Sequence, residues 1–123
     1  MNKELQSFNV GKVIVEKVGA ITKLSNKIFP MVANSGTQFP FCVYRRASYS
    51  PSNTKDGIGE QADIEIIVLS TKYNESLQLA NEIAQRLHGE STNEIEEIQL
   101  INAFETFSED TFIQTMNFRF IYK

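Results

Sequence analysis

The sequence predicts an α+β protein in which two main helices pack on an antiparallel sheet of about four strands. Two segments place apolar residues at three- and four-residue spacing, which is typical of helices, and several others alternate as strands do. The predicted order is helix, short extended piece, strand, loop, strand, helix, strand, strand. A length of 123 residues fits one domain over residues 1–123 with a single core.

The first helix is predicted over residues 4–19, although its run of β-branched residues also favours a strand. Gly11 should weaken this helix by about 1 kcal/mol relative to alanine, and Gly19 is placed to cap its end. Its apolar positions are Leu5, Phe8, Val10, Val13, Ile14 and Val18.

A short apolar turn at Ile21 and Leu24 precedes an extended piece at 28–30, because Pro30 disfavours a helical conformation at Phe29. Residues 34–36, Asn-Ser-Gly, predict a turn. Pro40 fits the start of a strand because it has no N–H to donate to a neighbouring strand.

The strand after Pro40 has two differently composed faces. Alternation places Phe41, Val43, Arg45 and Ala47 on one face, and Cys42, Tyr44, Arg46 and Ser48 on the other. Residues 50–57 are the most polar stretch, and we expect a mobile loop over 49–60. The next strand, 62–70, places Ala62, Ile64, Ile66 and Val68 on one face, and Asp63, Glu65, Ile67 and Leu69 on the other.

The second helix is the clearest element and covers residues 73–89. Asn74 is a suitable N-cap, Glu75 suits the first turn, and Gly89 ends the helix. The predicted apolar stripe consists of Leu77, Ala80, Ile83, Ala84 and Leu87.

Two strands joined by a hairpin loop at residues 108–110 complete the chain. The first has apolar residues on both parities, and adjacent Glu96 and Glu97 indicate a bulge. The last alternates, with Phe112, Met116, Phe118, Phe120 and Tyr122 on one face, and Ile113, Thr115, Asn117, Arg119 and Ile121 on the other.

One face of this sheet is expected to lie against a protein partner. Two helices can cover one face only, and apolar side chains also fall on the second face, where they would form an exposed patch. These residues are Ile67, Leu69, Ile101, Ile113 and Ile121. The alternative is that the first helix packs on this second face and makes a three-layer monomer.

Composition and motifs argue against an enzyme. Cys42 lacks a nearby base, since His88 is far away in sequence, and a buried strand cysteine is the simpler interpretation. We therefore predict no catalytic, cofactor or metal site. A net charge of −3 argues against nucleic-acid binding, and the absence of an apolar span or signal argues against a membrane partner.

Two other features leave alternatives open. Arg45 or Arg46 could bind a partner carboxylate, or the two could be a solvated pair at a strand end. Tyr49 and Tyr73 could anchor an interface or only pack at element ends.

From residue 28 onward the chain resembles a known family. The segment KIFPMVANSGTQFPFCVYRR, the strand ADIEIIVLSTKY, the helix ESLQLANEIAQRLHG and the ending NFRFIYK occur in the order and spacing of the tail completion proteins of long-tailed phages and prophages. The family's pattern is matched at Ile28, Phe29, Pro30, Pro40, Val43 and Tyr44, which are assigned to folding.

The resemblance implies a non-enzymatic virion protein with a tail-terminator-like fold. Such a protein forms a ring, typically hexameric, at the head-proximal end of the tail after assembly in the bacterial cytoplasm. The implied partners are the tail tube protein, the head–tail connector protein and other copies of the chain. The alternatives are another minor tail or neck component and a small-ligand binding module. The expected interface residues are Arg45, Arg46, Tyr49, Asp56, Glu65, Ile67, Ile113 and Arg119.

Overall fold

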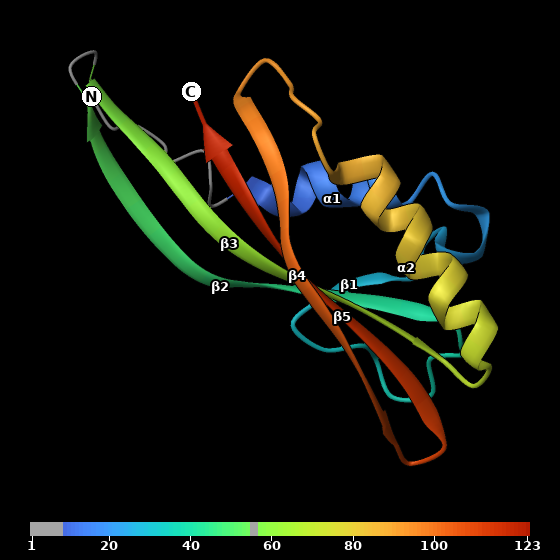
Figure 1. The fold of residues 1–123 in the computed structure, drawn as a ribbon. Coiled ribbons are helices and arrows are strands. Elements are labelled where there is room, and N and C mark those ends of the chain that lie inside the picture. Colours follow the sequence, from blue (N-terminus) through green and yellow to red (C-terminus); the bar gives the residue numbers. More distant parts are fainter. Residues whose placement is uncertain (1–8, 55–56) are drawn as a thin grey trace.

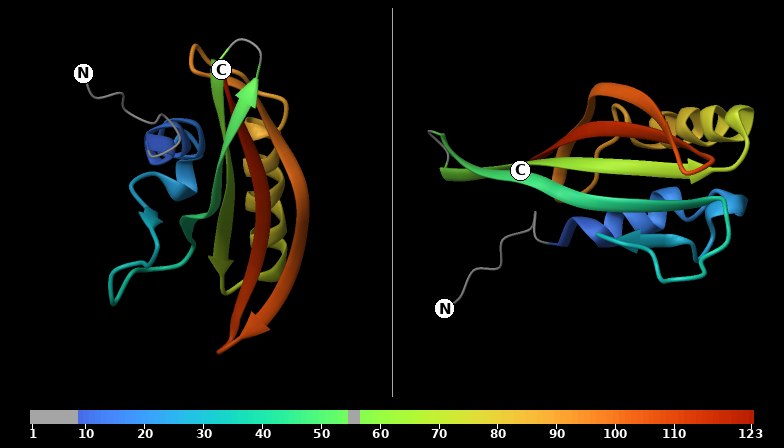
Figure 2. Two further views of the ribbon diagram at one scale, coloured as in Figure 1. Left: turned by 90° about the vertical axis from the view of Figure 1, so that its left-hand side faces the viewer. Right: turned by 90° about the horizontal axis from the view of Figure 1, so that it is seen from below.

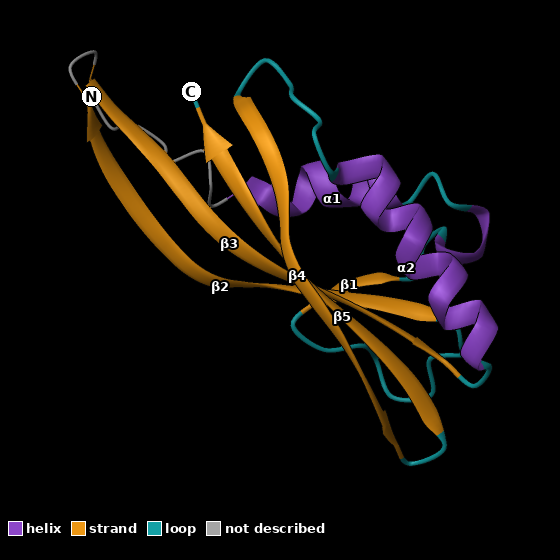
Figure 3. Ribbon diagram, viewed as in Figure 1, coloured by secondary structure: helices purple, strands orange, loops and turns teal. Residues whose placement is uncertain are grey.

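A computed structural model describes residues 9–54 and 57–123. Within these ranges the chain forms two α-helices, one 3₁₀ helix and one five-stranded sheet (Figures 1 and 3). The elements are α1 (Val10–Val18), the 3₁₀ helix (Thr22–Leu24), β1 (Ile28–Pro30), β2 (Phe41–Thr54), β3 (Gly57–Ser70), α2 (Tyr73–Leu87), β4 (Ile95–Ser108) and β5 (Thr111–Tyr122).

The strands lie in the order β1-β2-β3-β5-β4. Neighbours among β2, β3, β5 and β4 are antiparallel, as the sequence predicts, whereas the short β1 adds a parallel pair along residues 42–44 of β2. The α+β class is therefore confirmed, with one strand more than expected.

Both helices lie on the same side of the sheet (Figures 1 and 2). Val10, Ile14 and Val18 of α1 share one buried cluster with Leu79 and Ile83 of α2. The strands contribute to this cluster the face of β3 that carries alternate residues 62–68 and the face of β5 that carries alternate residues 116–122. The three-layer alternative, with α1 on the second face, is therefore wrong. No helix in the described residues is long and apolar enough to span a bilayer.

In α1, Gly11 faces the ring of Tyr44 on β2, and a Cβ at this position would collide with the tyrosine hydroxyl. Gly11 therefore permits close approach of helix and sheet. Gly19 caps the helix as expected, and its N–H donates to Val15 O at 2.9 Å, with an ordinary right-handed conformation. The predicted positions Leu5 and Phe8 lie outside the described residues.

In α2 two expectations are corrected. Asn74 lies inside the helix and Lys72 occupies the N-cap, because Ser70 Oγ accepts the Lys72 N–H at 3.0 Å and supplies the polar partner instead. Leu77 is 39% exposed, since the helix turns Ser76, Leu79, Ile83 and Leu87 towards the sheet. Gly89 follows the helix with a φ of 82°, a conformation that favours glycine, as predicted.

The expected loop over residues 49–60 is wrong. β2 continues to Thr54 and β3 starts at Gly57, so residues 48–54 pair with 57–63 as a long hairpin that extends past the end of β5 (Figure 1). A bulge between Arg46 and Ser48 also moves Ser48 to the face away from the helices, contrary to simple alternation.

The hairpin of β4 and β5 is confirmed, with Glu109 and Asp110 at positive φ in its turn. The register shifts between Ile95 and Glu97, where the sequence predicts a bulge, and shifts again between Leu100 and Asn102. The predicted turn at residues 34–36 is also present, with Thr37 N donating to Asn34 O at 3.1 Å.

Candidate interaction surface

The face of the sheet opposite the helices, here called the outer face, has no helix over it (Figure 2). Strand register groups its side chains into rows that cross four strands. Two rows are mainly apolar and are here called the apolar rows: Phe41–Leu69–Ile113–Thr106 and Val43–Ile67–Thr115–Phe104.

Aromatic side chains extend the apolar rows beyond β2. Phe29 of β1 pairs in register with Val43, and its ring lies 6.4 Å from that of Phe41 between centroids. Phe39, which is 40% exposed, lies 5.2 Å from Phe41. The result is a contiguous apolar half of the outer face that this chain alone leaves partly open to solvent.

The other half of the outer face is polar, and its side chains bond to one another across strands. Arg45 Nε donates to Glu65 at 2.8 Å, and Asn117 donates to Asn102 at 2.7 Å. Arg119 Nε donates to Asp63 at 3.0 Å. Apolar and polar groups are thus segregated into two halves of the outer face.

Five of the eight predicted interface residues share the outer face: Arg45, Glu65, Ile67, Ile113 and Arg119. Arg46 and Tyr49 instead lie on the helix side of β2, in register with Ile64 and Ala62. Asp56 lies outside the described residues. Of the expected apolar positions, Ile67, Leu69, Ile113 and Ile121 fall on the outer face, and Ile101 occupies the bulge of β4.

Sequence reasoning missed the exposed aromatic side chains of β4. Phe104 is 53% exposed and Phe107 is 58% exposed, beside Ile101 at 44%. Phe107 packs on Phe112 at 4.7 Å, and Phe112 contacts Tyr73 at 5.4 Å. The sequence did contain a signal for these exposed side chains. Residues 95–108 carry apolar side chains at both odd and even positions, whereas a strand with only one buried face needs them at one set of alternate positions.

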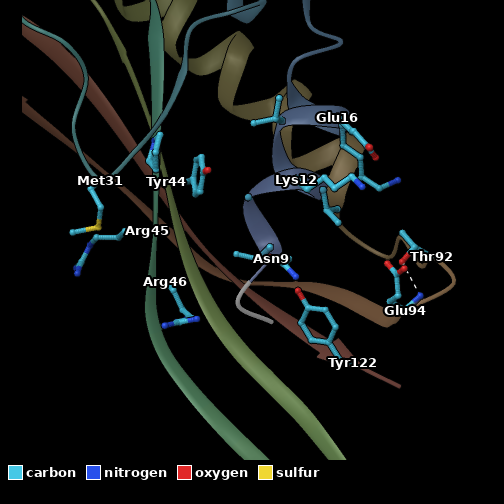
Figure 4. A pocket seen from close by; sticks show the side chains of 16 residues that line it. Asn9, Lys12, Glu16, Met31, Tyr44, Arg45, Arg46, Thr92, Glu94 and Tyr122 are labelled. Carbon is cyan, nitrogen blue, oxygen red and sulfur yellow. Dashed lines mark hydrogen bonds between the residues drawn. The ribbon is translucent and has the colours of Figure 1, made fainter. Parts of the chain in front are cut away.

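A broad groove of about 1540 Å³ lies between α1, the middle of β2 and the start of β4 (Figure 4). Arg45, Arg46, Lys12 and Glu94 line it, and Tyr122 closes one side. Burial, and then the nearby Glu60 and Glu94, raise the pKa of Tyr122, so its hydroxyl stays protonated. That hydroxyl has no hydrogen-bond partner among the described residues.

The residues considered for chemistry have structural roles. Cys42 is fully buried, and burial raises the pKa of its thiol to about 12, as expected for a core cysteine rather than a nucleophile. His88 Nδ1 accepts the Leu100 N–H at 3.0 Å and ties the end of α2 to β4. Within residues 9–54 and 57–123, no three His, Cys, Asp or Glu residues are grouped to hold a metal ion.

The tertiary structure of the described residues defines a small α+β protein with both helices on one sheet face and no helix on the other. A solved structure titled "Virion of native gene transfer agent (GTA) particle" contains a chain with this fold, at a TM-score of 0.68 and 15% identity. The match covers 95% of this chain and 89% of that chain. The comparison with curated proteins found no match.

A family model described as "Tail completion protein gp17" matches residues 15–123. The chain therefore belongs to the gp17 family of tail completion proteins, which are structural proteins of phage tails. The resemblance seen from residue 28 onward is confirmed, and the match also includes residues 15–18 at the end of α1.

Proposed function

We propose that the protein closes the head-proximal end of a phage tail tube and joins the tail to the head as a ring of identical subunits, without catalysis. Six copies fit the family resemblance. The observation that carries this proposal is the outer face, whose apolar rows have no cover from the chain's own helices.

The mechanism is geometric. When each subunit presents one surface to its neighbour and receives the neighbour on a different surface, repeated rotation about one axis closes a ring. A closed ring gives tube subunits a last layer from which the tube cannot grow. We propose that the outer face supplies part of the contact surface of the assembly, with the tail tube protein on one side of the ring and the connector on the other.

The segregation of the outer face suits such a role. Apolar rows give a desolvated centre to an interface, and the ion pairs Arg45–Glu65 and Arg119–Asp63 give it a polar margin. Because these pairs are partly exposed, they contribute little to the stability of the isolated chain and remain accessible to partner groups.

The experiment that tests the proposal replaces Ile113 by glutamate in the phage that carries the gene. Ile113 is half-buried on the outer face, so the free chain should still fold while the apolar centre of the interface receives a charge. We expect infectious particles to fall more than about tenfold, since a central interface residue typically contributes about 2 kcal/mol. Arg119→Glu should act in the same direction.

The matched control is Asn81→Glu, which introduces the same charge on the exposed surface of α2. Circular dichroism and thermal unfolding should show all three variants folded. Normal particle yield from folded Ile113→Glu would remove the outer face from the interface, and equal loss from Asn81→Glu would point to a general charge effect.

A further inference from the structure

The edge of β4 changes character at the bulge between Leu100 and Asn102. Before the bulge, the residues after α2 cover the edge: Ile98 N donates to Glu90 O at 3.0 Å, and Gly89 N donates to Ile98 O at 2.7 Å. Leu100 N donates to His88 Nδ1 at 3.0 Å. The backbone groups of Ile98 and Leu100 therefore point away from β5.

After the bulge, backbone groups of β4 again point away from β5, but no described segment covers them. Ile98 and Leu100 pair with alternate residues of β5, Phe120 and Phe118, and the next members of this series on β4 are Ala103, Glu105 and Phe107. Their N–H and C=O groups accordingly point outward. In the described part of the chain no strand lies beside β4 on this side.

Two of the usual features that prevent pairing, proline and lysine, are missing from this open edge. Residues 101–108 contain no proline and no lysine, and three of them are apolar side chains that are 44–58% exposed. Edge strands of monomeric proteins are usually short, charged or covered, because a bare edge is a template for another strand.

The opposite edge of the sheet, formed by β2, is also open over part of its length, and β2 runs in the direction that antiparallel pairing with β4 requires. β1 pairs only with residues 42–44 of β2, and the backbone bonds to β2 end with Met31 N donating to Tyr44 O at 2.9 Å. From Arg45 to Thr54 no described strand lies beside β2 on that side. Because β2, β3, β5 and β4 alternate in direction, β2 of a second copy can lie antiparallel to β4 with both copies in the same orientation.

We propose that adjacent copies of the protein pair β4 of one with β2 of the next, so that one β-sheet continues around the ring. This inference rests on the proposed function and specifies the subunit contact. It makes the contact heterologous, as a closed ring requires, because each copy contributes a different edge on its two sides.

Charge and side-chain size select the register. Arg46 opposite Glu105 places a guanidinium against a carboxylate whose described partners, Tyr73 and Gln114, are neutral. With the β2 bulge at Ala47, the same register places Tyr49 over the small Ala103 on the helix side, and on the outer face it sets Ser48 opposite Phe104. The pairing ends at Tyr44 of β2, because β1 of that same copy already pairs with β2 at this residue.

A disulfide tests this register in assembled particles. Ser48 and Phe104 would form a non-hydrogen-bonded pair, whose Cα atoms lie about 4.5 Å apart in antiparallel sheets and within disulfide reach. Particles that carry Ser48→Cys together with Phe104→Cys should, after mild oxidation, give a ladder of multiples of the 14.0 kDa chain on denaturing gels. Each single variant should remain monomeric, and Asn81→Cys with Phe104→Cys is the matched control.

Four results would overturn the proposal. Dimers from Phe104→Cys alone would indicate two-fold pairing of β4 with β4. A ladder of equal intensity from the Asn81→Cys control would indicate non-specific cross-linking. Absence of a ladder from particles that hold the chain at the head–tail junction would reject the edge contact and leave the proposed function intact, whereas absence of the chain from the junction would reject both.

A charge exchange covers the case in which the cysteine variants yield no particles. Arg46→Glu and Glu105→Arg should each reduce particle yield about tenfold or more because like charges then face each other across the contact. The double exchange should restore most of the loss if the two residues are opposite each other. Additive losses in the double variant would contradict the register.

Discussion

Gly11 and Tyr44 meet where α1 crosses β2, and this contact explains a glycine inside a helix. Alanine at a helix interior is normally more stable than glycine by about 1 kcal/mol. At position 11, however, the new Cβ would collide with the Tyr44 hydroxyl and touch the ring. The glycine therefore lowers the stability of the helix but allows α1 to pack closely on the sheet.

We expect Gly11→Ala to destabilise the protein when Tyr44 is present and to be less harmful, or stabilising, when Tyr44 is replaced by leucine. Urea unfolding of the four members of this double-mutant cycle measures the coupling, which should reach about 1 kcal/mol or more. Additive effects of the two changes would show that the ring moves aside at no cost.

Cys42 gives a second prediction at the residue scale. Its thiol is fully buried, and burial raises its pKa to about 12, so the reactive thiolate is nearly absent at neutral pH. The native chain should react with a thiol reagent only through unfolding, and labelling should accelerate sharply in denaturant. Rapid labelling of the folded chain would contradict the placement of Cys42 in the core.

The start of α2 is stabilised by Glu75 rather than by the expected Asn74. Glu75 accepts Ser70 Oγ at 2.7 Å and Lys23 Nζ at 2.9 Å, and its side chain is 16% exposed. The Ser70 hydroxyl first, and then Lys23, hold the pKa of Glu75 below its ordinary value. This carboxylate joins α2 to the end of β3 and to the 3₁₀ helix.

Because the pKa of Glu75 is lower in the folded than in the unfolded chain, its ionised carboxylate stabilises the folded state. This stabilisation is present when the pH is above the unfolded-state pKa of about 4.3, and it is lost as the pH falls through the folded-state pKa. Glu75→Gln should therefore cost about 1 kcal/mol of unfolding free energy at neutral pH. Denaturant unfolding at a series of acidic pH values should show the difference between the two proteins shrinking. A constant difference at all pH values would contradict the role of the charge.

At the scale of elements, the sequence was informative wherever one side of a segment is buried and the other is not. β5 alternates along its length because it lies in the middle of the sheet under α2, so its face was predicted correctly. The end of β2 could not be recognised, since residues 52–54 pair with residues 57–59, which lie beyond the end of β5. Residues 52–54 are Ser-Asn-Thr, so no hydrophobic pattern marks the strand there.

The arrangement of the candidate surface could not be read from the hydrophobic pattern of single strands. The segregation of apolar and polar rows depends on how four strands are aligned, and two register shifts in β4 and one in β2 determine that alignment. A bulge exchanges the faces of all residues after it, as at Ser48, and adjacent glutamates revealed only one of the three.

For the whole molecule, placing both helices on one side is the feature with the greatest functional consequence. It leaves the second face of the sheet without a covering helix, and the far half of the β4 edge without a neighbouring strand, in the described chain. The first surface offers apolar contact area and the second offers backbone hydrogen bonds. We propose that the assembled ring uses both surfaces, whereas an isolated subunit uses neither.

The most direct measurement is a reconstruction of the head–tail junction from assembled particles by electron cryomicroscopy. The account predicts a closed ring of this chain at the head-proximal end of the tail, with the outer face buried against neighbouring subunits or the tube and α2 directed away from the contacts. A ring that buries α2 and leaves the outer face in solvent, or a junction without this chain, would contradict it.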